Sequence, residues 1–337
     1  MINYREAIPK IDKKDIIKFL NKFDLKFEED IDYTIIAEED QKIVATGSLS
    51  ENVLKCFAVD KHYQGMSISN TIITKLLDKA YSLNRSHLFI FTKPENENIF
   101  KDFGFKEVCK VPEVMLLDNK IECLYERLNE LENSVESGAI VINANPMTKG
   151  HLKLIETCSK LVNKLYVFVV SEDKSIFPFK FRYKIVKEAC KGLKNVEVIE
   201  GSEYIISRNT FPTYFYKDSK IIIEAYTKLD ISIFAQYFAK AMNIKKRFVG
   251  TETNDLVTKD YNKKMKEILP EFGIELIEIE RFKETGEIIS ASTVRKLIAE
   301  SKFEESKKFL PDATIRALET PEGREIIEKL QKNWTNQ

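Results

Sequence analysis

Short apolar runs alternate with polar turn residues over residues 33–60 and predict an antiparallel meander of strands. Residues 69–83 then carry apolar side chains at helical spacing, with one face formed by Ile72, Ile73, Leu76, Leu77 and Ala80. A strand-like run at 87–92, a short helix around 97–103 and a strand near 105–108 follow. This order of elements favours an α+β domain over residues 1–127.

The pattern changes after the polar and charged stretch 128–138, which is interpreted as a linker. Five strand-like apolar runs follow it, at residues 139–144, 164–170, 196–200, 245–250 and 274–279. Helical patterns lie between several of these runs, at roughly 152–163, 181–193 and 217–242. Strands that alternate with helices of this length predict βαβ units and a parallel sheet with helices on both faces. The chain is therefore interpreted as an α/β protein whose second domain covers residues 139–337.

Composition and charge exclude several classes of function. Lys+Arg and Asp+Glu balance at 53 each, so the chain as a whole does not attract nucleic acid or an anionic membrane. No stretch has the length of a signal peptide or a membrane span, so a cytoplasmic location is expected. Five cysteines without a C-x-x-C pair and only three histidines argue against a His/Cys metal cluster.

The segment "NANPMTKGH", residues 143–151, joins the first strand of the predicted parallel sheet to a helix. Ligands of such sheets bind beyond the carboxyl ends of the strands, and a helix N-terminus attracts anions. Gly150 would allow a ligand to approach the backbone, and His151 could donate a hydrogen bond to phosphate. The alternative is an ordinary connection in which Asn145-Pro146 forms the turn and Thr148 caps the helix.

A second strand-to-helix junction, "GEIISASTVRKLIAE", places three hydroxyls and a guanidinium around a helix start: Ser290, Ser292, Thr293 and Arg295. Such a group can clamp phosphate; the alternative is a capped helix with a solvated arginine. Each junction alone is a weak signal, whereas two of them in one βαβ domain favour a phosphate-binding site.

These two segments resemble known motifs. "NPMTKGH" resembles the H-x-G-H motif of the nucleotidyltransferase superfamily, and "ISASTVR" resembles its I-S-x-S-x-x-R motif. The match is closest to the citrate lyase ligase family, and the stretches "FTKPENENIFKDFGF", "VVSEDKSIFPFKFRYKIVKE" and "TPEGREIIEKL" agree with it along nearly the whole chain. The resemblance implies a Rossmann-like domain that adenylates acetate with ATP. The acetyl group would then pass to the thiol of the coenzyme-A-like arm on the acyl carrier subunit of citrate lyase.

The resemblance also implies roles for individual residues. His151 would stabilise the α-phosphate, Thr148 would occupy the position of the first histidine of H-x-G-H, and Arg295 would hold phosphate during the chemical step. The remaining nucleotide contacts would come from Asn143, Asn145, Gly150, Lys174, Arg182, Gly250, Thr251, Glu252, Ser290, Ser292 and Thr293. A Mg²⁺ ion would bridge the phosphates, held by the nucleotide and water, so no dedicated metal ligands are expected in the protein.

Residues 53–77 resemble the acyl-coenzyme A motif of GNAT acetyltransferases, and "FKDFGF" resembles a segment near the end of that domain. Gln64 begins the motif, but Ser67 and Ser69 occupy its small-residue positions, where glycine normally lets backbone amides wrap a pyrophosphate. A GNAT-like domain could therefore recognise the carrier or its arm, or only support the second domain.

Three other functions remain open at this point. An adenylyltransferase could join AMP to a phosphorylated cofactor such as phosphopantetheine. An acetyl-coenzyme A transferase could act through the N-terminal domain, although Ser67 and Ser69 count against it. A nucleotide-binding regulatory module is the non-enzyme alternative, and the presence of His151 and Arg295 argues against it.

Overall fold

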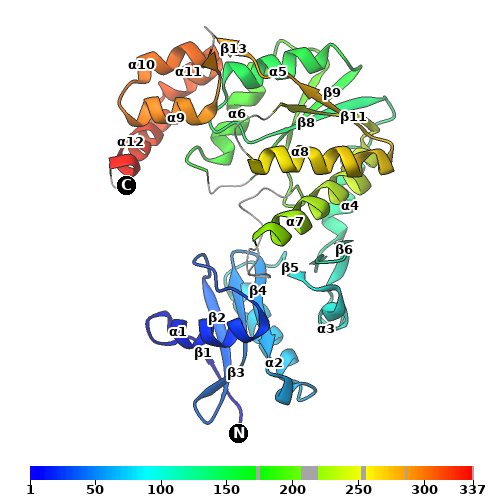
Figure 1. The fold of residues 1–337 in the computed structure, drawn as a ribbon, viewed down its shortest axis with the longest axis vertical. Helices are drawn as coiled ribbons and strands as arrows, with labels where there is room; N and C mark the ends of the chain where they lie inside the picture. The colour runs from blue at the N-terminus through cyan, green and yellow to red at the C-terminus, as the bar shows by residue number, and fades with distance from the viewer. Residues whose placement is uncertain (172–174, 206–218, 252–255, 285–286, 336–337) are drawn as a thin grey trace. The chain divides into compact units, whose positions relative to one another are not determined.

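The computed structural model describes residues 1–171, 175–205, 219–251, 256–284 and 287–335. The chain forms two compact units, each described here by itself (Figure 1). The N-terminal unit comprises Met1–Arg127 with Phe211–Leu229, of which residues 219–229 are described, and the C-terminal unit comprises Leu128–Thr210 with Asp230–Gln337.

The N-terminal unit is built on a mixed sheet with the strand order β1-β2-β3-β4-β5-β7-β6. Only the pair β4 and β5 is parallel; it aligns Val53 with Phe89 and Leu54 with Ile90, and the remaining pairs are antiparallel. The elements are β1 (Asn3–Glu6), α1 (Pro9–Leu20), β2 (Tyr33–Glu39), β3 (Lys42–Ser50), β4 (Val53–Val59), α2 (Ile68–Ser82), β5 (Phe89–Thr92), α3 (Glu97–Lys101), β6 (Lys106–Lys110), β7 (Met115–Asp118) and α4 (Glu122–Glu130).

Helix α2 packs its apolar face against this sheet, as the helical spacing predicted. Ile72, Ile73, Leu76 and Ala80 are buried, whereas Leu77 is only partly buried. The helix lies so close to β3 that a Cβ on Gly47 would be 2.7 Å from Ile72 Cγ2. The antiparallel meander of β2, β3 and β4 is confirmed.

The C-terminal unit contains a five-stranded sheet in the order β10-β9-β8-β11-β12, and all of its pairs are parallel, as predicted. Its strands are β8 (Ser137–Ile142), β9 (Lys164–Val169), β10 (Val196–Glu200), β11 (Ile244–Gly250) and β12 (Glu275–Ile279), and a hairpin follows of β13 (Lys283–Glu284) and β14 (Glu287–Ile288). Its helices are α5 (Lys149–Ser159), α6 (Phe179–Cys190), α8 (Leu256–Ile268), α9 (Ala291–Ala299), α10 (Phe303–Ser306), α11 (Asp312–Leu318) and α12 (Pro321–Thr335), with a π-helical turn at Phe234–Ala239. Helix α7 (Ser219–Ile233) is divided between the two units after Leu229.

Helices cover both faces of this sheet (Figure 1). Successive side chains of β9 point to opposite faces and therefore pack against different helices. Leu165, Val167 and Val169 belong to the core on the side of α5 and α6. Phe168 points to the opposite side, where its ring meets Phe234 and Phe238 edge-on at 6.0 and 5.9 Å between centroids. The predicted doubly covered parallel sheet is therefore confirmed.

The stretch predicted as a linker, residues 128–138, contains regular structure at both ends. Helix α4 continues to Glu130 and β8 already begins at Ser137. Residues 219–229 of α7 are grouped with the N-terminal unit, where Lys228 Nζ donates to Glu113 Oε1 at 2.9 Å. The domain limits at 127 and 139 stay predictions.

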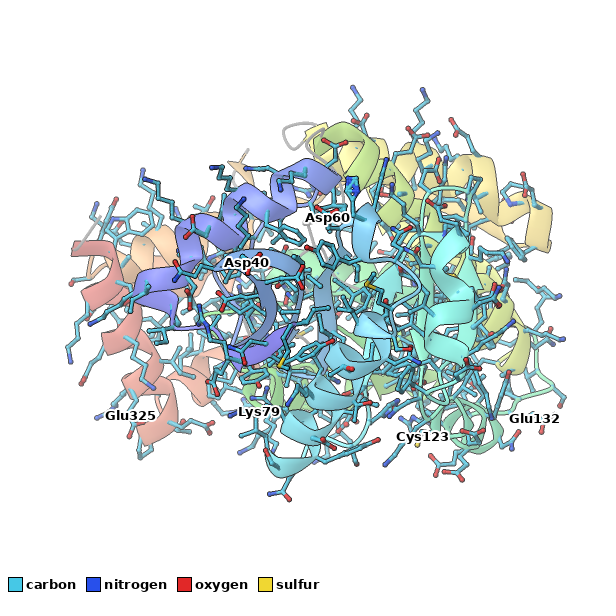
Figure 2. The ribbon with its side chains drawn as sticks, turned by 90° about the horizontal axis from the view of Figure 1, so that it is seen from below. Asp40, Asp60, Lys79, Cys123, Glu132 and Glu325 are labelled. Carbon is cyan, nitrogen blue, oxygen red and sulfur yellow. The ribbon has the colours of Figure 1, made fainter. Side chains whose placement is uncertain are left out.

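Four of the five cysteines are buried, and Cys123 is exposed, as Figure 2 shows. Burial raises the pKa of the Cys158 and Cys190 thiols to about 12, so both remain protonated at neutral pH. None of the described helices is long and apolar enough to cross a membrane.

Candidate nucleotide site

The loop after β8 is anchored by Met147 before it enters α5. Ala144 has a positive φ of 50°, and the Asn145-Pro146 bond is cis. Met147 is fully buried, and its carbonyl accepts a hydrogen bond from Thr314 Oγ1 at 3.0 Å. The loop therefore presents its polar residues from a fixed backbone at the carboxyl end of β8.

Thr148 and His151 form a capping box at the start of α5, which begins at Lys149 and not at residue 152 as predicted. Thr148 Oγ1 accepts from the His151 N–H at 3.4 Å, and the Thr148 N–H donates to His151 Nδ1 at 3.0 Å. The hydroxyl also lies 2.9 Å from Nδ1. Each residue thus satisfies a free backbone donor of the first helical turn.

This arrangement sets the protonation of His151. A backbone N–H can only donate, so Nδ1 acts as acceptor and the neutral ring carries its proton on Nε2. Burial, together with the positive charge of Arg281, lowers the pKa of His151 to about 4. At neutral pH the free protein therefore offers an uncharged Nε2–H donor at the N-terminus of α5.

Thr148 does not have the role predicted from the resemblance. Its side chain is 1% exposed and its hydroxyl is bonded within the capping box, so the structure favours a capping role over a ligand contact. The correction follows from helix geometry, because an N-cap side chain turns back to the first amides of its own helix. The alternative weighed from sequence, in which Thr148 caps the helix, describes the structure.

Ser290 is the N-cap of α9 and anchors the second motif. Its Oγ accepts from the Thr293 N–H at 3.2 Å and lies 2.6 Å from Ser292 Oγ. Ser292 and Thr293 are exposed at the helix start. The N-terminus of this nine-residue helix therefore combines free amides with several hydroxyls.

The structure brings the two motifs together. Arg295 donates from its guanidinium to the carbonyl of Asn145 at 2.5 Å, although the two residues are 150 positions apart. A Cβ on Gly150 would lie 3.4 Å from both Cβ and O of Ile289, the residue before the Ser290 cap. Burial lowers the pKa of Arg295, but an arginine stays charged at neutral pH. The prediction that both motifs serve one site therefore gains direct geometric support.

The loop after β9 is tied to the loop after β8 by asparagine side chains. Asn143 Oδ1 accepts from Ser175 Oγ at 3.4 Å, and Asn145 Oδ1 accepts from the Phe177 N–H at 3.3 Å. The amide nitrogens of both side chains remain able to donate to a ligand. Asn143 is exposed, which suits the predicted ligand contact.

Arg182 lies beneath these loops and not at the ligand face. It is 1% exposed and donates to the carbonyls of Phe177, Asn143 and Val170 at 2.8, 2.7 and 2.9 Å. The prediction that it offers a cation to phosphate is corrected, because its position on the buried face of α6 commits the guanidinium to backbone oxygens. Arg182 is instead a positioning residue that joins the ends of β8 and β9.

The end of β11 lies at the same edge of the sheet. The Gly250 carbonyl accepts from Asn262 Nδ2 at 3.2 Å, the Thr251 N–H donates to the Ile279 carbonyl at 2.9 Å, and Thr251 Oγ1 accepts from the Arg281 N–H at 3.2 Å. Arg281, whose charge acts on His151, was missed from sequence. Its position directly after the strand-like run 274–279 was the available signal.

Two predicted residues, Lys174 and Glu252, lie outside the described residues. Within the described ranges, no group of three or more His, Cys, Asp or Glu side chains could hold a metal ion. The side chains at the starts of α5 and α9 are neutral hydrogen-bond donors and one cation, Arg295, and such groups suit a polyanionic ligand.

A parallel sheet with two helix N-termini, an Nε2–H donor and a guanidinium at its carboxyl edge has the arrangement expected of a nucleotidyltransferase domain. The family model "Citrate lyase ligase C-terminal domain" matches residues 137–318, and the model "Acetyltransferase (GNAT) domain" matches residues 8–115. The chain belongs to the citrate lyase ligase family.

Curated relatives support this membership over nearly the full length. The [citrate [pro-3S]-lyase] ligase of Haemophilus influenzae is 40% identical and that of Klebsiella pneumoniae 36%; the alignments cover 89% and 91% of this chain and 93% and 92% of those proteins. A phosphopantetheine adenylyltransferase of Streptococcus sanguinis is 53% identical over 57 residues, which cover 16% of this chain and 35% of that protein. The second similarity is therefore partial.

Proposed function

We propose that this protein is an ATP-dependent ligase that adenylates acetate and passes the acetyl group to a protein-borne thiol. The acceptor is the prosthetic-group thiol on the acyl carrier subunit of citrate lyase, which is thereby activated. The observation that carries the proposal is the junction of His151, Arg295 and two helix N-termini at one sheet edge, in a chain that aligns with citrate lyase ligases over most of its length. The reaction would take place in the cytoplasm, where ATP is available.

The first step is attack of an acetate oxygen on the α-phosphorus of MgATP. A P–O bond forms to acetate, and the bond to pyrophosphate breaks with its electron pair on the leaving group. His151 donates Nε2–H to a non-bridging α-phosphate oxygen as negative charge develops there. The carboxylate needs no base, so the contribution of the protein is positioning and stabilisation of charge.

The pyrophosphate part would lie at the start of α9. Arg295 and the hydroxyls of Ser290, Ser292 and Thr293 would bind the β- and γ-phosphates together with the free amides of the helix. Because Asn145 holds the Arg295 guanidinium through its carbonyl, the cation is oriented before ATP arrives. Orientation in advance lowers the entropy cost of the reaction.

The other nucleotide contacts are assigned by their place at the sheet edge. Asn143 and Asn145 would donate from Nδ2 to phosphate or acyl oxygen, and Gly250 and Thr251 would line the nucleotide. Gly150 has no side chain, so a ligand could approach the backbone at the start of α5 beside Ile289. Lys174 and Glu252 complete the proposed set, and Mg²⁺ would arrive with ATP and remain bound to phosphate oxygens and water.

In the second step the carrier thiolate attacks the acetyl carbon of acetyl-AMP and AMP departs, which leaves a thioester. The N-terminal unit would recognise the carrier or its coenzyme-A-like arm, or would only support the second unit. Ser67, which replaces a small residue of the acyl-coenzyme A motif, is exposed with a φ of 57° at the start of α2. A left-handed conformation is one that glycine adopts more readily.

An adenylyltransferase that joins AMP to a phosphorylated cofactor is the second candidate. The similarity to phosphopantetheine adenylyltransferase favours it, but covers only 16% of the chain. Exchange of labelled pyrophosphate into ATP separates the two functions, measured with MgATP and a panel of short carboxylic acids or with 4′-phosphopantetheine. Exchange stimulated by acetate supports the ligase. If no acid stimulates exchange, the ligase function is refuted. Exchange stimulated by phosphopantetheine would then support the adenylyltransferase instead.

Arg295→Ala tests the placement of pyrophosphate. Loss of the guanidinium should raise the KM for ATP and lower the exchange rate by about 10²-fold or more, as for removal of a charge-stabilising donor. Arg295→Lys should not restore full activity, because lysine lacks the planar fork. Normal exchange kinetics in Arg295→Ala would show that the second motif does not bind the nucleotide.

A further inference from the structure

Four lysines, named the lysine row, follow the outer face of helix α6: Lys180, Lys184 and Lys187 lie within the helix, and Lys191 is its C-cap residue. The spacing of four, three and four residues places them on one side of the helix, and all four are exposed. The opposite side of α6 is buried through Phe181, Arg182, Ile185 and Val186. At 1.5 Å per residue the row extends over about 16 Å.

Little of this positive charge is neutralised locally. Among the described residues, Lys180 and Lys184 make no ion pair, and Lys187 lies 5.7 Å from the centre of the Tyr183 ring. Lys191 has a distant, exposed partner in Glu188 at 3.8 Å. In a chain with no formal net charge, such a row is a local excess of one sign.

Helix α8 shows the ordinary arrangement for comparison. Its exposed lysines Lys259, Lys263 and Lys266 have similar spacing, but Lys266 pairs with Glu278 at 2.7 Å and Asp260 lies within the same row. The lysine row has one exposed carboxylate within it, Glu188, whereas the α8 lysines have two beside them, Asp260 and Glu267, in addition to the pair with Glu278.

The lysine row starts beside the proposed active site. The residue two positions before α6, Phe177, is bonded to Asn145. Arg182 on the inner face of the same helix holds the Asn143 carbonyl. A partner lying along the row would therefore have one end next to the loops that face the nucleotide, without covering them.

We propose that the lysine row is the docking surface for an acidic face of the protein that carries the acceptor thiol. This inference rests on the proposed function, in which ATP and acetate diffuse freely but the acceptor thiol belongs to a protein. An acidic helix with carboxylates three and four residues apart would match the row. Opposite charges at a rim of this kind mainly raise the rate of encounter, and salt weakens the effect.

The test uses the full chain, the purified acyl carrier subunit and two assays. One variant changes Lys184, Lys187 and Lys191 to Glu and leaves Lys180, which is nearest the site, unchanged. The matched control changes Lys259, Lys263 and Lys266 to Glu, so that the net charge is the same. Acetate-dependent pyrophosphate exchange reports the first half-reaction, and transfer of labelled acetyl to the carrier reports the complete reaction over a range of salt concentrations.

The α6 variant should keep pyrophosphate exchange within about twofold, while its KM for the carrier rises about tenfold or more, since steering by charge changes association rates by 10- to 1,000-fold. The salt dependence of transfer should also shrink in this variant and not in the control. Equal carrier kinetics in the wild type and the α6 variant, or equal loss in the control, would overturn the docking surface. Absence of exchange in the wild type would instead overturn the proposed function beneath it.

Discussion

Acidification should destabilise the C-terminal unit through His151. Its pKa is lowered to about 4 in the folded protein, whereas an unfolded histidine titrates near 6.5, so below pH 6.5 only the unfolded state takes up the proton. Stability contributed by the neutral ring is therefore present above about pH 6.5 and is lost as the pH falls toward 4. Linkage gives a loss of about 2 kcal/mol between pH 7 and 5, and about 3 kcal/mol once the pH is well below 4.

His151→Gln isolates this effect. Glutamine is a usual N3 residue of a capping box, so its side-chain oxygen can replace Nδ1 as acceptor for the Thr148 N–H without titrating. The variant should unfold at pH 7 within about 1 kcal/mol of the wild type and should lose about 2 kcal/mol less on going to pH 5. It should also lose acetate-dependent exchange, because the Nε2–H donor is gone.

Urea unfolding at pH 7 and 5 measures this difference, with the fluorescence of Trp334 in α12, the only tryptophan, as the probe of the C-terminal unit. His62→Gln, an exposed histidine, is the control. Because the chain has three histidines, an NMR titration can also assign the resonances by these variants. An identical pH dependence in wild type and His151→Gln, or a His151 resonance titrating near 6.5, would refute the reasoning.

Three further predictions concern residues that position the loops at the ends of the strands. Thr148→Ala should cost about 1 kcal/mol of stability and Thr148→Ser much less, with exchange largely kept in both; abolished exchange in a folded Ala variant would return the hydroxyl to the ligand site. Arg182→Met should cost about 3 kcal/mol or more in urea unfolding, because three buried carbonyls lose their donor; a change in ATP affinity alone would contradict the positioning role. Gly201→Ala should destabilise by about 2 kcal/mol or more, since its Cβ would lie 2.5 Å from the Val169 carbonyl, whereas Gly192→Ala, which meets open space, should be tolerated; equal melting temperatures would refute this.

The periodicity of apolar residues was sufficient for most of the regular structure. All five strands of the parallel sheet and helix α2 lie where their patterns predicted them, because burial of one or both faces imposes a period on the chain. Strand β1, helix α1 and strand β7 were not identified. The two strands are only four residues long and depend on pairing with distant partners, β1 with β2 and β7 with β5, which a local pattern does not contain.

The sequence predicted where the candidate site lies, and its role in nucleotide binding stays a prediction, but the sequence did not predict how the side chains at this place are arranged. The sequence placed His151 and Arg295 at strand-to-helix junctions. Ligands of parallel sheets bind beyond the carboxyl ends of the strands, so both residues were expected at one edge of the sheet. Arg182 lies three and four residues before Ile185 and Val186, so helical spacing already placed it on the buried face, and the predicted contact with phosphate disregarded that signal. Arg281 was missed because its effect on the pKa of His151 is electrostatic and depends on proximity in space, which the sequence does not show.

The capping box also explains how threonine can stand where related motifs have a first histidine. A second imidazole at this position would add a donor at the ligand face, whereas Thr148 is buried and acts through its N–H and hydroxyl on His151. Arg295 is a separate feature of the same loop, where the Asn145 carbonyl holds its guanidinium. In the proposed mechanism one neutral donor aligned by the helix cap and one cation aligned by the loop would act on the two sides of the breaking P–O bond.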